Sequence, residues 1–168
     1  MKFKIKKIAH IAEIFGGVAV LISLLFVGVQ LKESTKATRS ATAAATISNI
    51  SDWYVTLGTN GESSASFWRF LADPESMTKE ERLQHIYIVH GLILTFQNSY
   101  FLAQEGTLDI RIHESINQAI IGVKDQPGFI LYWKSRKSIF FQEYQDYVDA
   151  ILQSDENVSE GIYYKPND

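Results

Sequence analysis

The sequence predicts an all-α protein in which one N-terminal transmembrane helix continues into a long helix, with about four shorter helices packed as a bundle. Three observations support this fold class. Residues 14–31 carry no charge and, at about 1.5 Å of rise per residue, match the hydrocarbon thickness of a bilayer. Apolar residues further along recur at helical spacing. Strand-like alternation of apolar and polar residues is not found in the sequence.

The apolar segment divides the chain into three predicted parts. We expect a basic-flanked transmembrane anchor over residues 1–39 with its span at about 11–31, an acidic helical domain over 40–153, and a polar tail over 154–168. A cleaved signal peptide is an alternative, but its apolar core is usually only about 7–15 residues long, and no small-residue cleavage site directly follows this segment. A buried core helix of a soluble protein is the other alternative.

Charge is distributed unevenly along the chain. Residues 1–39 carry a net charge of +5 and residues 40–168 a net charge of −8, which together give −3. An acidic domain repels phosphate backbones, so we expect no nucleic-acid binding, whereas the basic end suits anionic lipid headgroups. The chain has no cysteine, which excludes disulfides, thiolate catalysis and Cys-based metal sites.

The first predicted helix runs from near Ile8 to Leu57. Its part beyond the span carries an apolar stripe at steps of 4, 3, 4 and 3, formed by Ala43, Ile47, Ile50, Tyr54 and Leu57. Residues 58–61, Gly-Thr-Asn-Gly, should end it, because Gly and Asn accept the backbone conformation of a helix end.

A short helix should follow over residues 63–72 and stop at Asp73, since the residue before a proline avoids helical geometry. Thr78 and Glu81 have the spacing of a capping box, which predicts a helix from there to about Gln104. One stripe of this helix contains Leu83, Tyr87, His90, Leu94, Gln97 and Phe101.

Three further helix signals lie in the C-terminal third. Asp109 should cap a helix that reaches about Val123, and Pro127 suits the first turn of another helix, where its missing N–H costs nothing. A last helix is predicted over residues 138–152.

Candidate chemical sites are weak. Glu81 and His85 have the i, i+4 spacing of two metal ligands, but such pairs are common on helix surfaces, and zinc signatures have more ligands. His90 lies on the stripe and is expected to be buried beside Gln97 or a tyrosine rather than to act as a base. We therefore assign no metal ligand, no cofactor-binding residue and no catalytic residue, and expect a protein that is not an enzyme.

Two clusters in the C-terminal third have a possible binding role and a more ordinary structural explanation. An aromatic series at helical spacing favours a core over a ligand pocket, and it consists of Phe129, Tyr132, Trp133, Phe140, Phe141, Tyr144 and Tyr147. A basic cluster, Lys134, Arg136 and Lys137, can meet an anion or lipid headgroups, although a solvated face is the default.

Small residues share one face of the anchor. Ala12, Gly16, Ala19 and Ser23 are spaced 4, 3 and 4 apart, and we name them the small-residue face. Small side chains let helices approach closely in lipid, so this face is a possible helix–helix interface, although Gly and Ala are also simply frequent in spanning helices.

Residues in the anchor and at two later places form a pattern known from other sequences, namely Glu13, Ile14, Phe15, Gly16, Gly17, Val18, Ala19, Val20, Ser23, Leu24, Gly28, Gln30, Leu31, Lys32, Thr35, Lys36, Ala37, Arg39, Asp73, Pro74, Glu75, Ser76, Met77, Thr78, Pro127, Gly128, Phe129, Trp133 and Arg136. This pattern resembles a widespread family of small bacterial proteins with one N-terminal transmembrane helix, a helical domain and no assigned activity. It implies a bacterial inner-membrane location and supplies no catalytic residues.

Two observations predict opposite orientations of the chain in the membrane. Four lysines precede the span and three basic residues follow it closely, which favours a cytoplasmic N-terminus by one or two charges. Members of the similar family tend to place basic residues after the span, which implies a cytoplasmic domain.

These observations predict a membrane-anchored interaction or scaffold protein, either self-associating or an accessory subunit of a membrane complex. The expected partners are the lipid bilayer and a membrane protein or a second copy. The alternative is a small-ligand sensor with a pocket between the aromatic helices, and an enzyme is the least favoured reading. The sequence does not identify a ligand.

Overall fold

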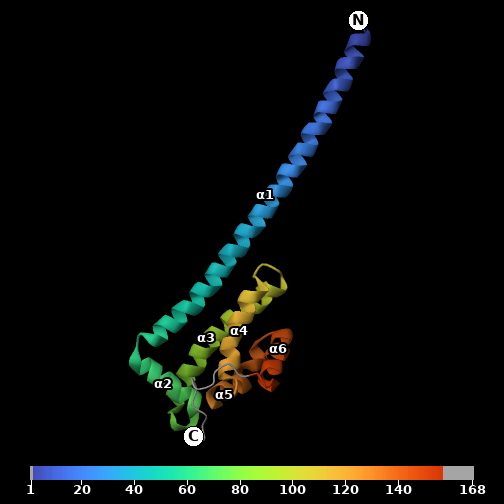
Figure 1. Ribbon diagram of the computed structural model, residues 1–168. Helices are drawn as coiled ribbons and strands as arrows, with labels where there is room; N and C mark the ends of the chain where they lie inside the picture. The colour runs from blue at the N-terminus through green and yellow to red at the C-terminus, as the bar shows by residue number, and fades with distance from the viewer. Residues whose placement is uncertain (1, 157–168) are drawn as a thin grey trace. The chain divides into compact units, whose positions relative to one another are not determined.

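A computed structural model describes the backbone of residues 2–156 and the side chains of residues 13–156. Within these residues the chain is all-helical and has no strand, as predicted. The elements, shown in Figure 1, are α1 (Lys2–Gly58), α2 (Gly61–Ala72), the 3-10 helix η1 (Pro74–Ser76), α3 (Lys79–Gln104), α4 (Ile110–Val123), α5 (Pro127–Arg136), the 3-10 helix η2 (Lys137–Ile139) and α6 (Gln142–Gln153).

The first helix is longer than predicted, because it begins at Lys2 rather than near Ile8. Its 57 residues correspond to about 85 Å at the usual rise of about 1.5 Å per residue. The chain divides into two compact units, Met1–Ala41 and Thr42–Asp168, so α1 contributes to both. We call the described part of the second unit the helical domain.

The turn after α1 is shorter than predicted. The side chain of Asn60 accepts a hydrogen bond from the backbone N–H of Ser63 at 3.0 Å, which caps a helix that begins at Gly61 instead of residue 63. Ser64 donates from its hydroxyl to the carbonyl oxygen of Leu57 at 2.6 Å. These two contacts join the end of α1 to the start of α2.

The cap signals of the middle helices are confirmed. Thr78 and Glu81 form the capping box, with the Glu81 N–H 3.2 Å from Thr78 Oγ1 and the Thr78 N–H 2.9 Å from Glu81 Oε2. Asp109 accepts from the N–H of Arg111 at 3.0 Å and begins α4. Pro127 occupies the first position of α5, as expected.

The last helix begins four residues later than predicted, at Gln142. Phe140 and Phe141 have extended backbones, with ψ angles of 156° and 153°, so the chain leaves helical geometry there. Phe140 is buried, and its ring stacks on Trp133 with centroids 5.5 Å apart. Burial of the Phe140 ring against α5 therefore outweighs the local preference for helix.

The core of the helical domain is largely aromatic and lies among α2, α3, α4, α5 and α6. In this domain α3 packs beside α4, and α2 packs against α5 (Figure 1). Its largest fully buried side chains include Tyr132, Tyr144, Phe70, Phe96 and Phe129. The chain thus buries large side chains in a domain of modest size.

Gly128 sets the distance between α5 and α2. A Cβ atom at this position would lie 2.8 Å from the carbonyl carbon of Phe70 and 2.9 Å from Leu71 Cα, and closer still to the carbonyl oxygen of Phe70. Only a residue without a side chain permits this backbone contact.

The predicted stripe of α3 lies mostly on a different side from the core. On α3, four members of the stripe are exposed, namely Leu83, Tyr87, Leu94 and Phe101. The buried face of α3 instead contains His85, Val89, Ile93, Phe96 and Ser99. It mixes apolar residues with a histidine and a serine, so the hydrophobic pattern alone points to the wrong face.

The predicted stripe on the last part of α1 is packed in part, since two of its members, Ile50 and Leu57, lie on the packed face. Ile47 and Tyr54 are about half exposed, whereas Thr46 is buried and Ile50 is packed against the core. The packed face of α1 is formed by Thr46, Ile50, Trp53 and Leu57. Ile47 and Tyr54 line an open groove of about 560 Å³ together with residues of α4.

Candidate functional site

The apolar segment of α1 has no packing partner among the described residues. All side chains from Glu13 to Leu31 are exposed, and nothing lies within 4 Å of a Cβ placed at Gly16, Gly17 or Gly28. α1 and α3 are both long and apolar enough to cross a membrane, but α3 provides core residues of the helical domain. Of these two helices, only α1 has an apolar segment with every described side chain exposed, because α3 is exposed on one face and buried on the other.

The small-residue face is exposed over the part whose side chains are described. Gly16, Ala19 and Ser23 are all accessible, and the side chain of Ala12 lies outside the described side chains. The Ser23 hydroxyl donates to the carbonyl oxygen of Ala19 at 2.8 Å. Its hydrogen bond is thus made within the helix, which leaves a shallow surface suited to close helix contact.

Glu81 and His85 do not form the surface pair that their spacing in the sequence indicates. The ring of His85 is 5 % exposed, Nε2 lies 2.8 Å from Ser66 Oγ, and the ring stacks on Phe70 with centroids 5.4 Å apart. Burial lowers the pKa of His85. Glu81 is engaged in the capping box instead. Among the residues with described side chains, no group of three His, Cys, Asp or Glu is placed to hold a metal.

His90 is half-buried and contacts a tyrosine, which is one of the two partners expected. Its Nδ1 lies 3.1 Å from the hydroxyl oxygen of Tyr132. Burial, followed by the nearby Arg136 charge, lowers the pKa of His90. The other expected partner, Gln97, instead accepts from the backbone N–H of Phe141 at 3.4 Å.

A buried polar network that the sequence analysis missed joins α3, α4 and α6. His113 Nδ1 lies 3.1 Å from Ser99 Oγ, and His113 Nε2 lies 2.8 Å from Asn117 Nδ2. Asn117 Nδ2 also donates to the hydroxyl of Tyr147. Burial lowers the pKa of His113 and raises the pKa of Tyr147 to about 12. His113 and Asn117 are four residues apart on one helix, which was the available signal.

This network includes the residue types of a nucleophilic site but not its accessibility. Ser99 is 0 % exposed and His113 is 3 % exposed, so no substrate reaches the Ser99 hydroxyl in this conformation. A nucleophile must lie within reach of the atom that it attacks. The network therefore acts to position three helices against one another.

Most of the aromatic series belongs to the core. Five of its members, Phe129, Tyr132, Trp133, Phe140 and Tyr144, are buried, whereas Phe141 is exposed and Tyr147 is half-buried. Stacked and edge-on contacts join Trp133 of α5, Phe140 of the segment between the helices and Tyr144 of α6. The five buried aromatics are therefore part of the core, as their helical spacing predicts.

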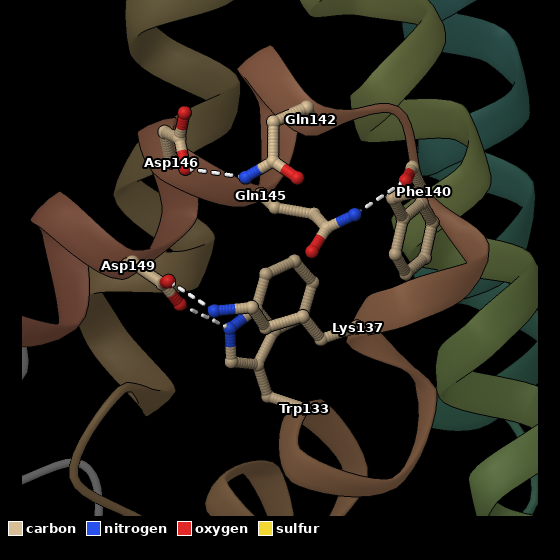
Figure 2. Close-up of polar contacts among 7 residues, drawn as sticks. All are labelled: Trp133, Lys137, Phe140, Gln142, Gln145, Asp146 and Asp149. Carbon is tan, nitrogen blue, oxygen red and sulfur yellow. Dashed lines mark hydrogen bonds and ion pairs between the residues drawn. The ribbon is translucent and has the colours of Figure 1, made fainter.

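Polar contacts tie α6 to α5 and to the segment between them (Figure 2). Asp149 accepts from the Trp133 Nε1–H at 2.8 Å and pairs with Lys137. Burial alone would raise the pKa of Asp149, but the hydrogen bonds from Lys137 and Trp133 outweigh it and lower that pKa. Gln145 donates to the carbonyl oxygen of Phe140 at 2.7 Å.

These contacts engage part of the basic cluster. Lys137 is the partner of Asp149, and the Arg136 guanidinium lies over the Tyr87 ring, 5.5 Å from its centroid. Lys134 is exposed. The three residues therefore do not present a joint surface of free cations.

An apolar cavity of about 130 Å³ lies between the last part of α1 and helices α2 to α5. Its walls include Trp53 of α1, Phe67 and Trp68 of α2, Phe96 of α3 and Ala119 of α4. No charged residue lines it. From the aromatic series only Phe129 contributes to its wall, so the cavity lies elsewhere than the pocket considered from the sequence.

The chain was compared with protein-family models, with curated proteins and with solved structures, and none of them matches it.

Proposed function

We propose that the chain is a single-pass membrane protein whose N-terminal helix anchors an acidic helical domain and brings it to a membrane-embedded partner. The observation that carries this proposal is the exposed, uncharged segment Ile14–Leu31 of α1. Exposed apolar surfaces of this extent mark membrane or protein contacts, because water does not stabilise them.

The free energy of insertion supports a lipid environment for this segment. Twelve large apolar side chains are exposed in it, namely Ile14, Phe15, Val18, Val20, Leu21, Ile22, Leu24, Leu25, Phe26, Val27, Val29 and Leu31. At about −0.3 to −0.6 kcal/mol for each such residue at mid-bilayer, about 4–7 kcal/mol is the upper limit of their contribution to insertion, because residues at the ends of the segment lie nearer the headgroups. Hydrogen bonds within the helix satisfy the backbone, as a bilayer requires.

The proposed location is the inner membrane of a bacterium, which the resemblance to the family of small bacterial proteins implies. The lysines on both sides of the segment suit two headgroup layers. The four lysines before it favour a cytoplasmic N-terminus, which places the helical domain on the opposite side of the membrane.

The proposed mode of action is helix association through the small-residue face. Lipid is as apolar as the side chains, so close van der Waals packing becomes the main attraction between spanning helices. Gly16, Ala19 and Ser23 offer such packing because they are small and the Ser23 hydroxyl is already hydrogen-bonded within α1. The partner is either a second copy of the chain or a helix of another membrane protein.

Gly16→Leu tests this mode of action, with Gly17→Leu as the matched control. Both glycines have open space around them, and they lie about 100° apart around the helix. Each substitution adds the same side chain at the same depth, so insertion should be equally favourable. Association should fall about tenfold or more only in Gly16→Leu, measured by crosslinking in native membranes and by particle mass in detergent.

Equal association of the two variants would show that the small-residue face is not the contact. A fall in both would indicate that α1 associates without a preferred face. Loss of either variant from the membrane fraction would contradict the proposed anchor itself.

A further inference from the structure

We propose that the apolar cavity of the helical domain is a binding site for one neutral apolar molecule about the size of a single aromatic ring. This inference concerns the second unit alone and does not depend on the proposed anchor. The site lies between Trp53 at the end of α1 and Phe129 at the start of α5.

The size of the cavity supports this ligand class. Protein interiors are close-packed, and voids larger than a water molecule are few. A cavity of about 150 Å³ lined by aliphatic and aromatic side chains stays dry and takes up benzene. The present cavity, at about 130 Å³, is close to that size and differs in opening to the surface beside Trp68 and Tyr54.

The chemistry of the walls decides which molecules fit. Phe67, Phe96 and Phe129 present aromatic surface, and Leu71 and Ile93 are aliphatic. No charged side chain lines the cavity, so an ionised ligand would lose its hydration without gaining a partner. A neutral ring, in contrast, is transferred from water to an apolar surface that stacks on it.

The cavity also has a route for exchange. Trp68 and Tyr54 line it and are 38 % and 48 % exposed, so its wall reaches the surface of the domain. The way in therefore passes exposed side chains, whose rotamer changes are faster than movements of whole helices.

Fluorine NMR of the full chain in detergent tests the proposal, with benzene as the probe. The chain has three tryptophans, and 5-fluorotryptophan labelling gives each one a signal. Trp53 and Trp68 line the cavity. Trp133 does not line it and is hydrogen-bonded to Asp149, so its signal serves as an internal reference. Benzene should shift the signals of Trp53 and Trp68 saturably and leave that of Trp133 in place.

Ala119→Leu should abolish these saturable shifts, because the added side chain occupies the cavity from α4. Ala150→Leu, which adds the same side chain on an exposed position of α6, is the control and should retain them. If Ala119→Leu does not fold, judged by an altered Trp133 signal, Val123→Leu fills the cavity more gently and takes its place.

Three results would overturn the proposal. The first is a shift that grows linearly with benzene, as expected from partition into the micelle alone. The second is a saturable shift of equal size in a folded cavity-filling variant. The third is the absence of any shift at Trp53 and Trp68.

Discussion

Replacing Gly128 by alanine should destabilise the helical domain, although alanine is the better helix former. The new Cβ would meet the carbonyl carbon of Phe70 at 2.8 Å and Leu71 Cα at 2.9 Å, whereas carbon atoms ordinarily stay about 3.5–4.0 Å apart. Both neighbours are backbone atoms, so no side-chain rotation relieves the contact.

The size of the effect follows from two opposing terms. Overpacking costs about 1–3 kcal/mol, and the backbone contact places Gly128→Ala near the upper end. Helix propensity returns up to about 1 kcal/mol. The free energy of unfolding should therefore fall by about 2 kcal/mol. Because Leu71 and Phe129 line the cavity beside this contact, ligand binding there should weaken as well.

Gly91→Ala is the matched control, since Gly91 lies inside α3 with nothing within 4 Å of its added Cβ. It should raise the free energy of unfolding by about 0.5–1 kcal/mol. Urea unfolding of the full chain in detergent, followed by tryptophan fluorescence, measures both variants. A Gly128→Ala midpoint at or above that of the unsubstituted chain would refute the close approach of α5 and α2.

Three further predictions concern stability, each measured by urea unfolding. Burial lowers the pKa of His113, so the unfolded chain binds more protons than the folded chain below about pH 6.5. The free energy of unfolding should therefore fall as the pH is lowered from about 7.5 to 5.5, and it should fall less steeply in His113→Gln. A free energy of unfolding that does not change over this pH range would contradict the prediction. Asp149→Ala should lower the free energy of unfolding by about 1–3 kcal/mol, because it removes the acceptor of the buried Trp133 N–H. Asp149→Asn should lower it less, because an amide oxygen still accepts this hydrogen bond. Equal losses of stability in the two variants would show that only the charge of Asp149 matters. Thr78→Ala should lower the free energy of unfolding by about 1 kcal/mol, because the helix cap is lost. An unchanged unfolding midpoint would show that Glu81 stabilises the first turn of α3 without the Thr78 side chain.

Local signals in the sequence predicted the helix boundaries that depend on one or two residues. The capping box at Thr78 and Glu81, the cap at Asp109 and the position of Pro127 are confirmed because each acts within a single turn. The sequence predicts Asn60 as part of a helix stop, whereas in the structure its side chain caps the start of α2. A residue that suits both a helix end and a helix start is ambiguous without its neighbours in space.

Features that depend on contacts between helices were not predictable. The core face of α3 includes His85 and Ser99, which look polar in the sequence and become buried through contacts with Ser66 and His113. Phe140 interrupts the last predicted helix because its ring is needed in the core. The cavity has no sequence signature, since it is space left between five helices.

The most direct test of the proposed anchor is the accessibility of two single cysteines on either side of residues 14–31. The chain has no cysteine, so Lys4→Cys and Asn60→Cys each introduce its only thiol. A membrane-impermeant maleimide, applied to intact spheroplasts, labels only residues outside the cytoplasm. We predict that Asn60→Cys is labelled at once and that Lys4→Cys is labelled only after the membrane is opened. Labelling of both in intact spheroplasts, or loss of residue 4 from the mature protein by cleavage, would contradict a membrane-spanning anchor.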